Sequence, residues 1–214
     1  MLERSTIPNI ITVGRIVMAP VVTGLLFIPS FTARILSWIL FLIAAFSDLW
    51  DGHLARKHGW ISDFGKLIDP LADKLLLLCT FLPFYLISQR PGPGNALPII
   101  TSLPLWVILV IFGRELLITA LRSYAANRGT IIPAGRAGKQ KAVFQNIFIG
   151  GTILWYALQS AALRHGWHGS FWADWQIFHG WFFIVTLVLA IYFTVYSMIV
   201  YLRNWKTLHL PRPG

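Results

Sequence analysis

Charged side chains are scarce in this sequence. They make up 12% of the 214 residues, whereas soluble globular domains carry roughly 25%. Only eight residues are acidic, and there is a single cysteine, Cys79. A chain with so few charges cannot cover its surface in water, and a lone cysteine forms no intrachain disulfide. These shortages exclude a soluble globular enzyme, a secreted disulfide scaffold and a disordered protein.

Apolar residues are abundant instead. They make up 56% of the chain, and the mean hydropathy is +0.65. Six apolar segments cover residues 10–28, 35–50, 70–87, 99–124, 142–163 and 177–202. Each is near the ~20 residues that cross ~30 Å of hydrocarbon, and backbone groups in lipid must be satisfied within the segment. We therefore expect an all-α, integral membrane protein, with one six-helix transmembrane bundle over residues 1–214 and loops at 91–95 and 165–176.

The basic residues are distributed unevenly along this predicted topology. Of the 18 lysines and arginines, three (Arg34, Arg90 and Arg164) fall in loops on one side of the membrane. The other fifteen belong to the side that holds both termini. The positive-inside rule places that side in the cytoplasm, and we expect a multi-pass protein of the bacterial inner (cell) membrane. Anionic lipid headgroups are suitable partners for these charges. Nucleic acid is not, because the charges flank hydrophobic spans.

Five of the eight acidic residues lie between positions 48 and 73. Asp48 and Asp51 are three residues apart, and Asp69 and Asp73 are four apart. On helices, both spacings put two carboxylates on one face. Four carboxylates at neighbouring helix ends would repel one another, and divalent cations such as Mg²⁺ or Mn²⁺ resolve that conflict. The alternative is a salt-bridged loop in which these acids pair with nearby lysines and arginines.

The complete pattern Asp48-x2-Asp51-Gly52-x2-Ala55-Arg56-x8-Gly65-x3-Asp69-x3-Asp73 resembles the signature of the CDP-alcohol phosphatidyltransferases. The resemblance implies two divalent cations and the transfer of a phosphoryl-linked group from a CDP-linked donor to an alcohol, with release of CMP. It implies that Asp48, Asp51 and Asp69 are metal ligands. Asp73 is the expected general base, and a metal-ligand role for it is also open. Residues expected at the CDP-linked donor are Gly52, Ala55, Arg56 and Gly65.

Other segments are similar to the phosphatidylglycerophosphate synthase branch of that family. They are residues 7–15, residues 62–74, Arg114-Glu115 with Thr119 to Arg122, and Gly138-Lys139-x-Lys141-x3-Gln145. This similarity implies CDP-diacylglycerol as donor and glycerol 3-phosphate as acceptor. Ala142 departs from the branch, which usually has threonine there.

A cationic cluster supports a phosphate-bearing acceptor. Arg114 and Arg122 are eight residues apart, so they share one helix face, and Lys139 and Lys141 open the next span at the same end. Such a pocket suits a dianionic phosphate. The alternative is that these residues are ordinary positive-inside charges.

Two residues of the first span have open roles. Thr12 and Arg15 are expected at the phosphates of the donor, but Arg15 could equally snorkel to the interface.

Other functions are also considered. Another acceptor within the same family (inositol phosphate, serine or phosphatidylglycerol) is the nearer alternative, and a membrane transporter is the distant one, because the acids lie at helix ends and no internal repeat is visible. A homodimer is expected only by analogy with the family.

Overall fold

The computed structural model describes the backbone of residues 6–58, 63–128 and 135–206, and the side chains of 9–47, 68–128 and 135–205. Within these ranges the chain forms six α-helices and no β-strand beyond one isolated bridge. The helices are α1 (Thr6–Phe27), α2 (Phe31–His58), α3 (Asp63–Ser88), α4 (Leu105–Asn127), α5 (Arg136–His165) and α6 (Ser170–Lys206). The all-α, six-helix prediction is confirmed.

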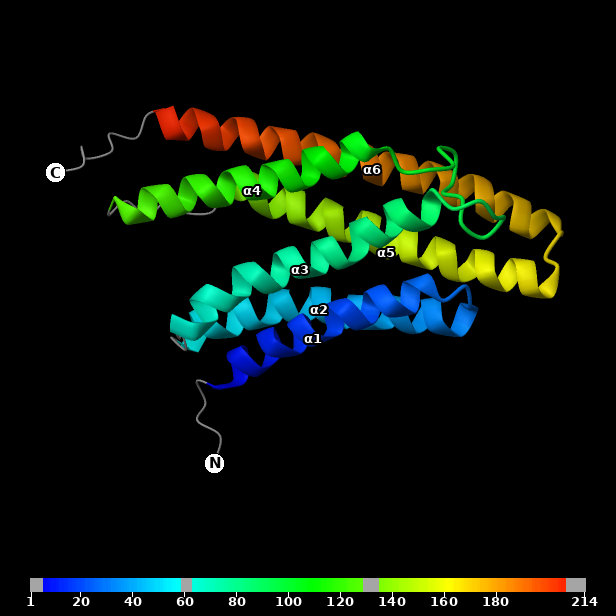
Figure 1. Cartoon of the computed structure of the whole chain (residues 1–214), viewed down its shortest axis with the longest axis horizontal. Coiled ribbons are helices and arrows are strands. Elements are labelled where there is room, and N and C mark those ends of the chain that lie inside the picture. The colour runs from blue at the N-terminus through cyan, green and yellow to red at the C-terminus, as the bar shows by residue number, and fades with distance from the viewer. Residues whose placement is uncertain (1–5, 59–62, 129–134, 207–214) are drawn as a thin grey trace.

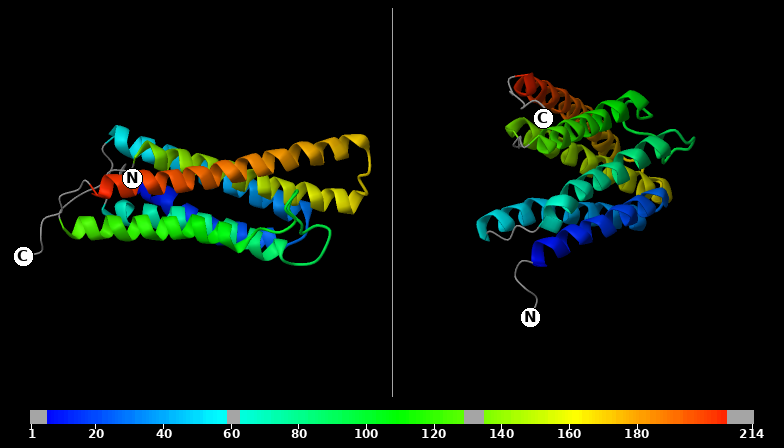
Figure 2. Two further views of the ribbon diagram at one scale, coloured as in Figure 1. Left: turned by 90° about the horizontal axis from the view of Figure 1, so that it is seen from above. Right: turned by 60° about the vertical axis from the view of Figure 1, so that its left-hand side comes forward.

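The helices lie side by side and alternate in direction (Figure 1). The start of α1 and the end of α6 lie at the same end of the bundle, as a second view shows (Figure 2). The ends of α2 and α4 and the starts of α3 and α5 lie at this end too. We call it the motif end because the aspartate pairs are there. α1 packs against α2 and α3, α5 packs against α2 and α6, and α4 packs chiefly against α6.

Four helical segments are long and apolar enough to cross a membrane: Asn9–Phe27, Ile68–Ser88, Arg136–His165 and Ser170–Trp205. In the part of α2 whose side chains are described, Phe31–Ser47 is apolar, and α4 carries the charges of Arg114, Glu115 and Arg122. Even α1, with 22 residues, is about 33 Å long at 1.5 Å per residue, enough for ~30 Å of hydrocarbon. Each of the six helices, with 22 residues or more, is therefore long enough to reach across the hydrocarbon.

The fourth helix begins later than the sequence predicted. It starts at Leu105 rather than at residue 99, with Pro104 as its N-cap. Before it, residues 97–101 form a tight loop in which the Leu97 N–H donates to the Thr101 carbonyl at 2.7 Å. Ile99 and Thr101 adopt the left-handed conformation, with φ of 65° and 59°, which no helix can contain. Apolar composition alone does not reveal such a loop.

The predicted loop at 165–176 is present but shorter, and covers residues 166–169. α5 ends at His165, with Gly166 as its C-cap in the left-handed conformation at a φ of 61°, and α6 already begins at Ser170. A glycine is the usual residue for this helix ending, because it has no β carbon to clash. Trp172 and Trp175 belong to the first turns of α6, where Trp172 donates its backbone N–H to the Gly169 carbonyl at 3.0 Å.

An aromatic core fixes α3, α5 and α6 relative to one another. The ring of Phe148 on α5 lies 5.4 Å from that of Phe81 on α3 and 5.1 Å from that of Phe183 on α6. At Gly151 the backbone of α5 comes so close to the ring of Phe182 that an added β carbon would collide with it. Small residues of this kind let membrane helices approach closely. These contacts set how α5 faces α3 at the motif end.

Arg34 joins several elements at the opposite end of the bundle. The sequence suggested a loop residue, but Arg34 lies in the first turn of α2 with only 2% of its surface exposed. Its guanidinium donates to the carbonyls of Gly94 and Tyr156 and to the Ser160 hydroxyl, at 3.2, 3.1 and 2.7 Å. These bonds hold the 91–97 loop against α5.

Candidate active site

Two residues of α1 contact the two carboxylates of α3. Arg15 Nη1 lies 2.8 Å from Asp73 Oδ1, and its Nη2 lies 3.6 Å from Asp69 Oδ1. The Thr12 hydroxyl donates to Asp69 Oδ1 at 2.6 Å. Thr12 and Arg15 are one turn apart on α1, and Asp69 and Asp73 are one turn apart on α3. Each residue of the α1 pair therefore lies opposite one carboxylate of the α3 pair. The contacts between α1 and α3 thus orient the second aspartate pair.

Arg15 does not snorkel. It is 1% exposed, whereas the side chains of Asp69 and Asp73 are 51% and 56% exposed. A buried guanidinium needs an anionic partner, and here the partners are the carboxylates of the motif. The assignment of Thr12 and Arg15 to the donor phosphates stays a prediction. The contacts given above join them to Asp69 and Asp73.

The remaining residues of the motif lie on helical backbone, but their side chains fall outside the described part. Asp48, Asp51, Gly52, Ala55 and Arg56 belong to the last turns of α2, which runs on to His58. Gly65 belongs to the first turn of α3. Both aspartate pairs therefore lie on helical backbone at the motif end, in keeping with their helical spacing. Among residues with described side chains, no group of three metal-binding acids, histidines or cysteines occurs.

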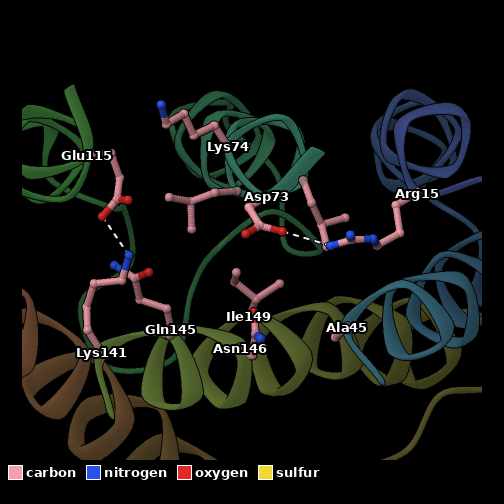
Figure 3. Close-up of a pocket in the computed structure, with 12 residues that line it drawn as sticks. Arg15, Ala45, Asp73, Lys74, Glu115, Lys141, Gln145, Asn146 and Ile149 are labelled. Carbon is pink, nitrogen blue, oxygen red and sulfur yellow. Dashed lines mark hydrogen bonds and ion pairs between the residues drawn. The ribbon is translucent and has the colours of Figure 1, made fainter. Parts of the chain in front are cut away.

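A cavity of about 130 Å³ opens beside Asp73 (Figure 3). Its walls come from five helices, since it is lined by Arg15 of α1, Ala45 of α2, Asp73 of α3, Glu115 of α4 and Lys141 of α5, among others. In Figure 3, Asp73 and Arg15 lie on one side and Glu115 and Lys141 on the other. The floor is formed by α5. The cavity thus has a carboxylate on one side and a buried amine on the opposite side.

Glu115 forms ion pairs with two cations, Arg114 on its own helix and Lys141 on α5. Lys141 Nζ lies 2.6 Å from Glu115 Oε1, and Arg114 Nη1 lies 3.1 Å from the same oxygen. Lys141 is 7% exposed. The Arg114 Nε also donates to the Ser197 hydroxyl of α6 at 3.2 Å. The group of Arg114, Glu115 and Lys141 therefore carries one net positive charge, and only Glu115 and Lys141 of the three line the cavity.

The structure does not bring Arg122 and Lys139 to this cavity. Both are exposed, and the Arg122 guanidinium lies over the ring of Tyr201 on α6, 5.7 Å from its centroid. Arg114 and Arg122 share a face of α4, as predicted, but that face packs against α6, as the contacts to Ser197 and Tyr201 show. Of the four cations predicted for the acceptor phosphate, Lys141 is the one that lines the cavity.

Two contacts at this site were missed by sequence reasoning. Glu115 was noted only beside Arg114 in a segment of family similarity, yet its shortest contact is with Lys141, 26 positions away. The buried amide of Gln145 donates to the Thr194 hydroxyl of α6 at 3.1 Å. No local spacing rule joins residues on different helices. The available signal was only the presence of polar side chains in apolar segments.

Comparison with known proteins settles the family. Residues 5–200 match the family model described as CDP-alcohol phosphatidyltransferase. The chain belongs to this family. The match covers all six helices almost to the end of α6, so the resemblance read from the aspartate motif extends to the whole bundle. Membership also makes the chain an integral membrane protein, consistent with its four long apolar segments.

Relatives within the family share much of the chain. A protein of Bacillus subtilis named CDP-diacylglycerol–glycerol-3-phosphate 3-phosphatidyltransferase is 30% identical over 215 residues, which cover 94% of this chain and 96% of the relative. A protein of Rickettsia typhi with the same name is 32% identical over 148 residues, covering 69% and 76%. A probable phosphatidylglycerophosphate synthase of Mycobacterium tuberculosis is 35% identical over 153 residues, covering 70% and 66%.

Proposed function

We propose that this protein transfers a phosphatidyl group from CDP-diacylglycerol to glycerol 3-phosphate, forming phosphatidylglycerophosphate and CMP. The observation that carries the proposal is the cavity with Asp73 on one side and buried Lys141 on the other. A phosphate-bearing alcohol needs both, a base for its hydroxyl and a cation for its phosphate. The names of the relatives support the same reaction. The alignment with one of them covers 94% of the chain at 30% identity.

The reaction is an in-line displacement at phosphorus. The terminal hydroxyl oxygen of glycerol 3-phosphate attacks the phosphorus that carries the diacylglycerol. The bond from this phosphorus to the oxygen that bridges to CMP breaks, and CMP leaves with that oxygen. Asp73 is the carboxylate to accept the hydroxyl proton, because it lines the cavity while the ion pair with Arg15 at 2.8 Å holds its orientation.

The donor chemistry of the motif fits a hard divalent cation. Asp69 and Asp73 present half-exposed carboxylates on one face of α3, and carboxylate oxygens are ligands that Mg²⁺ and Mn²⁺ prefer. We infer that Asp48, Asp51, Asp69 and Asp73 hold two such cations. When bound, they would polarise the phosphoryl group and neutralise the charge of the departing CMP. Gly52, Ala55, Arg56 and Gly65 would then face the donor.

Lys141 is suited to the phosphate of the acceptor. It is a compact point charge, buried at the cavity wall and held in place by Glu115. The net positive charge of Arg114, Glu115 and Lys141 attracts a dianion without leaving Lys141 unpaired before the acceptor arrives. An alcohol without phosphate would gain nothing from this arrangement.

We also propose the orientation in the membrane. By the topology predicted from the sequence, fifteen of the 18 lysines and arginines fall on the side of the motif, so the active site and both termini would face the cytoplasm at the inner (cell) membrane. Association into a homodimer, inferred from the family, stays a prediction.

The test is an assay of CMP release by the purified protein with CDP-diacylglycerol and a panel of acceptors. Glycerol 3-phosphate should support turnover, with phosphatidylglycerophosphate as the lipid product. Serine, inositol phosphate and phosphatidylglycerol should be poor acceptors. Faster turnover with one of these three would assign the protein to another reaction of the same family, and no CMP release with any acceptor would refute transferase activity.

A further inference from the structure

Two carboxamide side chains line the floor of the cavity and have no part in the reaction as described so far. Gln145 and Asn146 are neighbours on α5, next to Lys141 in the lining of the cavity. Gln145 lies one helical turn beyond Lys141, about 6 Å along the axis. In Figure 3 both residues lie along α5 between Lys141 and the part of the helix that faces Arg15, with Asp73 above them. The two carboxamides therefore lie in the middle part of the cavity, between Lys141 and Arg15.

The hydrogen bonds of Thr194 determine which way the Gln145 carboxamide faces. The Thr194 hydroxyl donates its one hydrogen to the Ala190 carbonyl at 2.6 Å. It can therefore only accept from Gln145, whose Nε2 lies 3.1 Å away. The amide nitrogen is thus turned to α6, and the carbonyl oxygen lies on the cavity side, as Figure 3 shows. A carbonyl oxygen at that position attracts a hydroxyl donor and repels a phosphate.

The neighbouring Asn146 can supply hydrogen-bond donors, which the carbonyl oxygen of Gln145 cannot. Its side chain is partly buried, lines the cavity and makes no hydrogen bond with any residue that the structure describes. A carboxamide offers two N–H donors as well as a carbonyl oxygen. Because polar groups in a membrane bundle are costly unless they find partners, a ligand in the cavity is the natural partner for this one.

We infer that Gln145 and Asn146 bind the middle hydroxyl of the acceptor and make the enzyme selective for a vicinal diol phosphate. The inference rests on the proposed function, because it needs the phosphate at Lys141 and the terminal hydroxyl at Asp73. A three-carbon acceptor held in that way has its second carbon above the floor of the cavity. The secondary hydroxyl then donates to the Gln145 carbonyl oxygen and accepts from the Asn146 amide.

The experiment compares glycerol 3-phosphate with 3-hydroxypropyl phosphate, which lacks only the middle hydroxyl. For each preparation the ratio of the two kcat/KM values is measured, so a partly folded variant still reports its selectivity. The wild type should favour glycerol 3-phosphate on the order of ten- to a hundredfold, because the analogue leaves buried polar groups without partners. Asn146→Leu and Gln145→Leu should each lower this ratio on the order of tenfold.

Gln159→Leu is the matched control. It removes a carboxamide from the same helix, in a part of α5 that lines a groove at the far end of the bundle, and it should leave the ratio unchanged.

Two outcomes would overturn the inference while the proposed function stands. In the first, the wild type uses glycerol 3-phosphate but accepts the analogue equally well. In the second, the wild type discriminates but both leucine variants keep its full selectivity. If the wild type fails to use glycerol 3-phosphate at all, the proposed function fails, and the inference falls with it.

Discussion

Replacing Arg15 with methionine tests whether α1 supports the catalytic carboxylates. The substitution keeps a long apolar stem but removes the guanidinium that lies 2.8 Å from Asp73 and 3.6 Å from Asp69. Without it, two carboxylates one turn apart on α3 lose their buried counter-ion. We expect the carboxylate of Asp73 to lose its fixed orientation, and turnover to fall.

The size of the effect follows from the contact. A hydrogen bond to a charged group contributes ~1.5–3 kcal/mol. The Asp73 side chain is 56% exposed, so water screens the pair and the lower end applies. About 1.5 kcal/mol corresponds to a decrease in kcat on the order of tenfold. Arg15→Lys should recover part of the loss, because lysine keeps the charge but offers no forked donor to reach two carboxylates.

The assay is the initial rate of CMP release with each substrate varied in turn, which separates kcat from the two KM values. Arg15→Met should lower kcat and leave both KM values nearly unchanged. Arg164→Met, at the opposite end of the bundle, is the matched control and should behave as the wild type. Thermal unfolding of each variant in detergent shows whether the protein is still folded.

Two results would refute this reasoning. An unchanged kcat would mean that Asp73 does not depend on Arg15. A raised KM for CDP-diacylglycerol with an unchanged kcat would mean instead that Arg15 holds the phosphates of the donor, the role that the sequence predicted.

Three further predictions follow from the site and the fold. A chelator should abolish CMP release, and Mg²⁺ or Mn²⁺ should restore it; full activity in excess chelator would refute the two-cation proposal. Lys141→Met should raise the KM for glycerol 3-phosphate on the order of ten- to a hundredfold, while substitution of the exposed Lys139 with methionine should change this KM little. Equal increases in the two variants would show that burial at the cavity does not determine which lysine binds the acceptor. Gly151→Ala should destabilise the protein by ~1–3 kcal/mol in thermal unfolding, because its β carbon would collide with Phe182. Gly113→Ala, where a β carbon meets nothing, should not.

Local patterns in the sequence were sufficient for the class of the protein and its family. Runs of apolar residues determine how many helices form, because a backbone in lipid must satisfy its own hydrogen bonds. The two aspartate pairs are separated by three and four residues, so a helix places each pair on one face whatever its surroundings. The motif is likewise a local pattern, so it indicated the family without any knowledge of the fold, and the comparison confirmed that family.

The same patterns failed where a boundary depends on contacts from elsewhere. Residues 97–104 are apolar enough to extend a helix, yet they form a loop. α5 holds the start of this loop, since Trp155 Nε1 donates to the Ala96 carbonyl at 2.9 Å and the Tyr156 hydroxyl to the Asn95 carbonyl at 3.3 Å. The reverse happened at residues 170–176, which were predicted to belong to a loop but form the start of α6.

Only the tertiary structure decided which charges act together. The sequence placed Arg15, Asp73, Glu115 and Lys141 on four different helices. It indicated chemical roles for Arg15, Asp73 and Lys141, but not the partners of any of the four. Packing of α1 against α3 joined Arg15 to Asp73, and packing around α5 joined Lys141 to Glu115. It also turned Arg122 toward Tyr201, away from the cavity. Helical spacing fixes which residues share a face, whereas the direction in which that face points is set by the fit of side chains between helices distant in sequence.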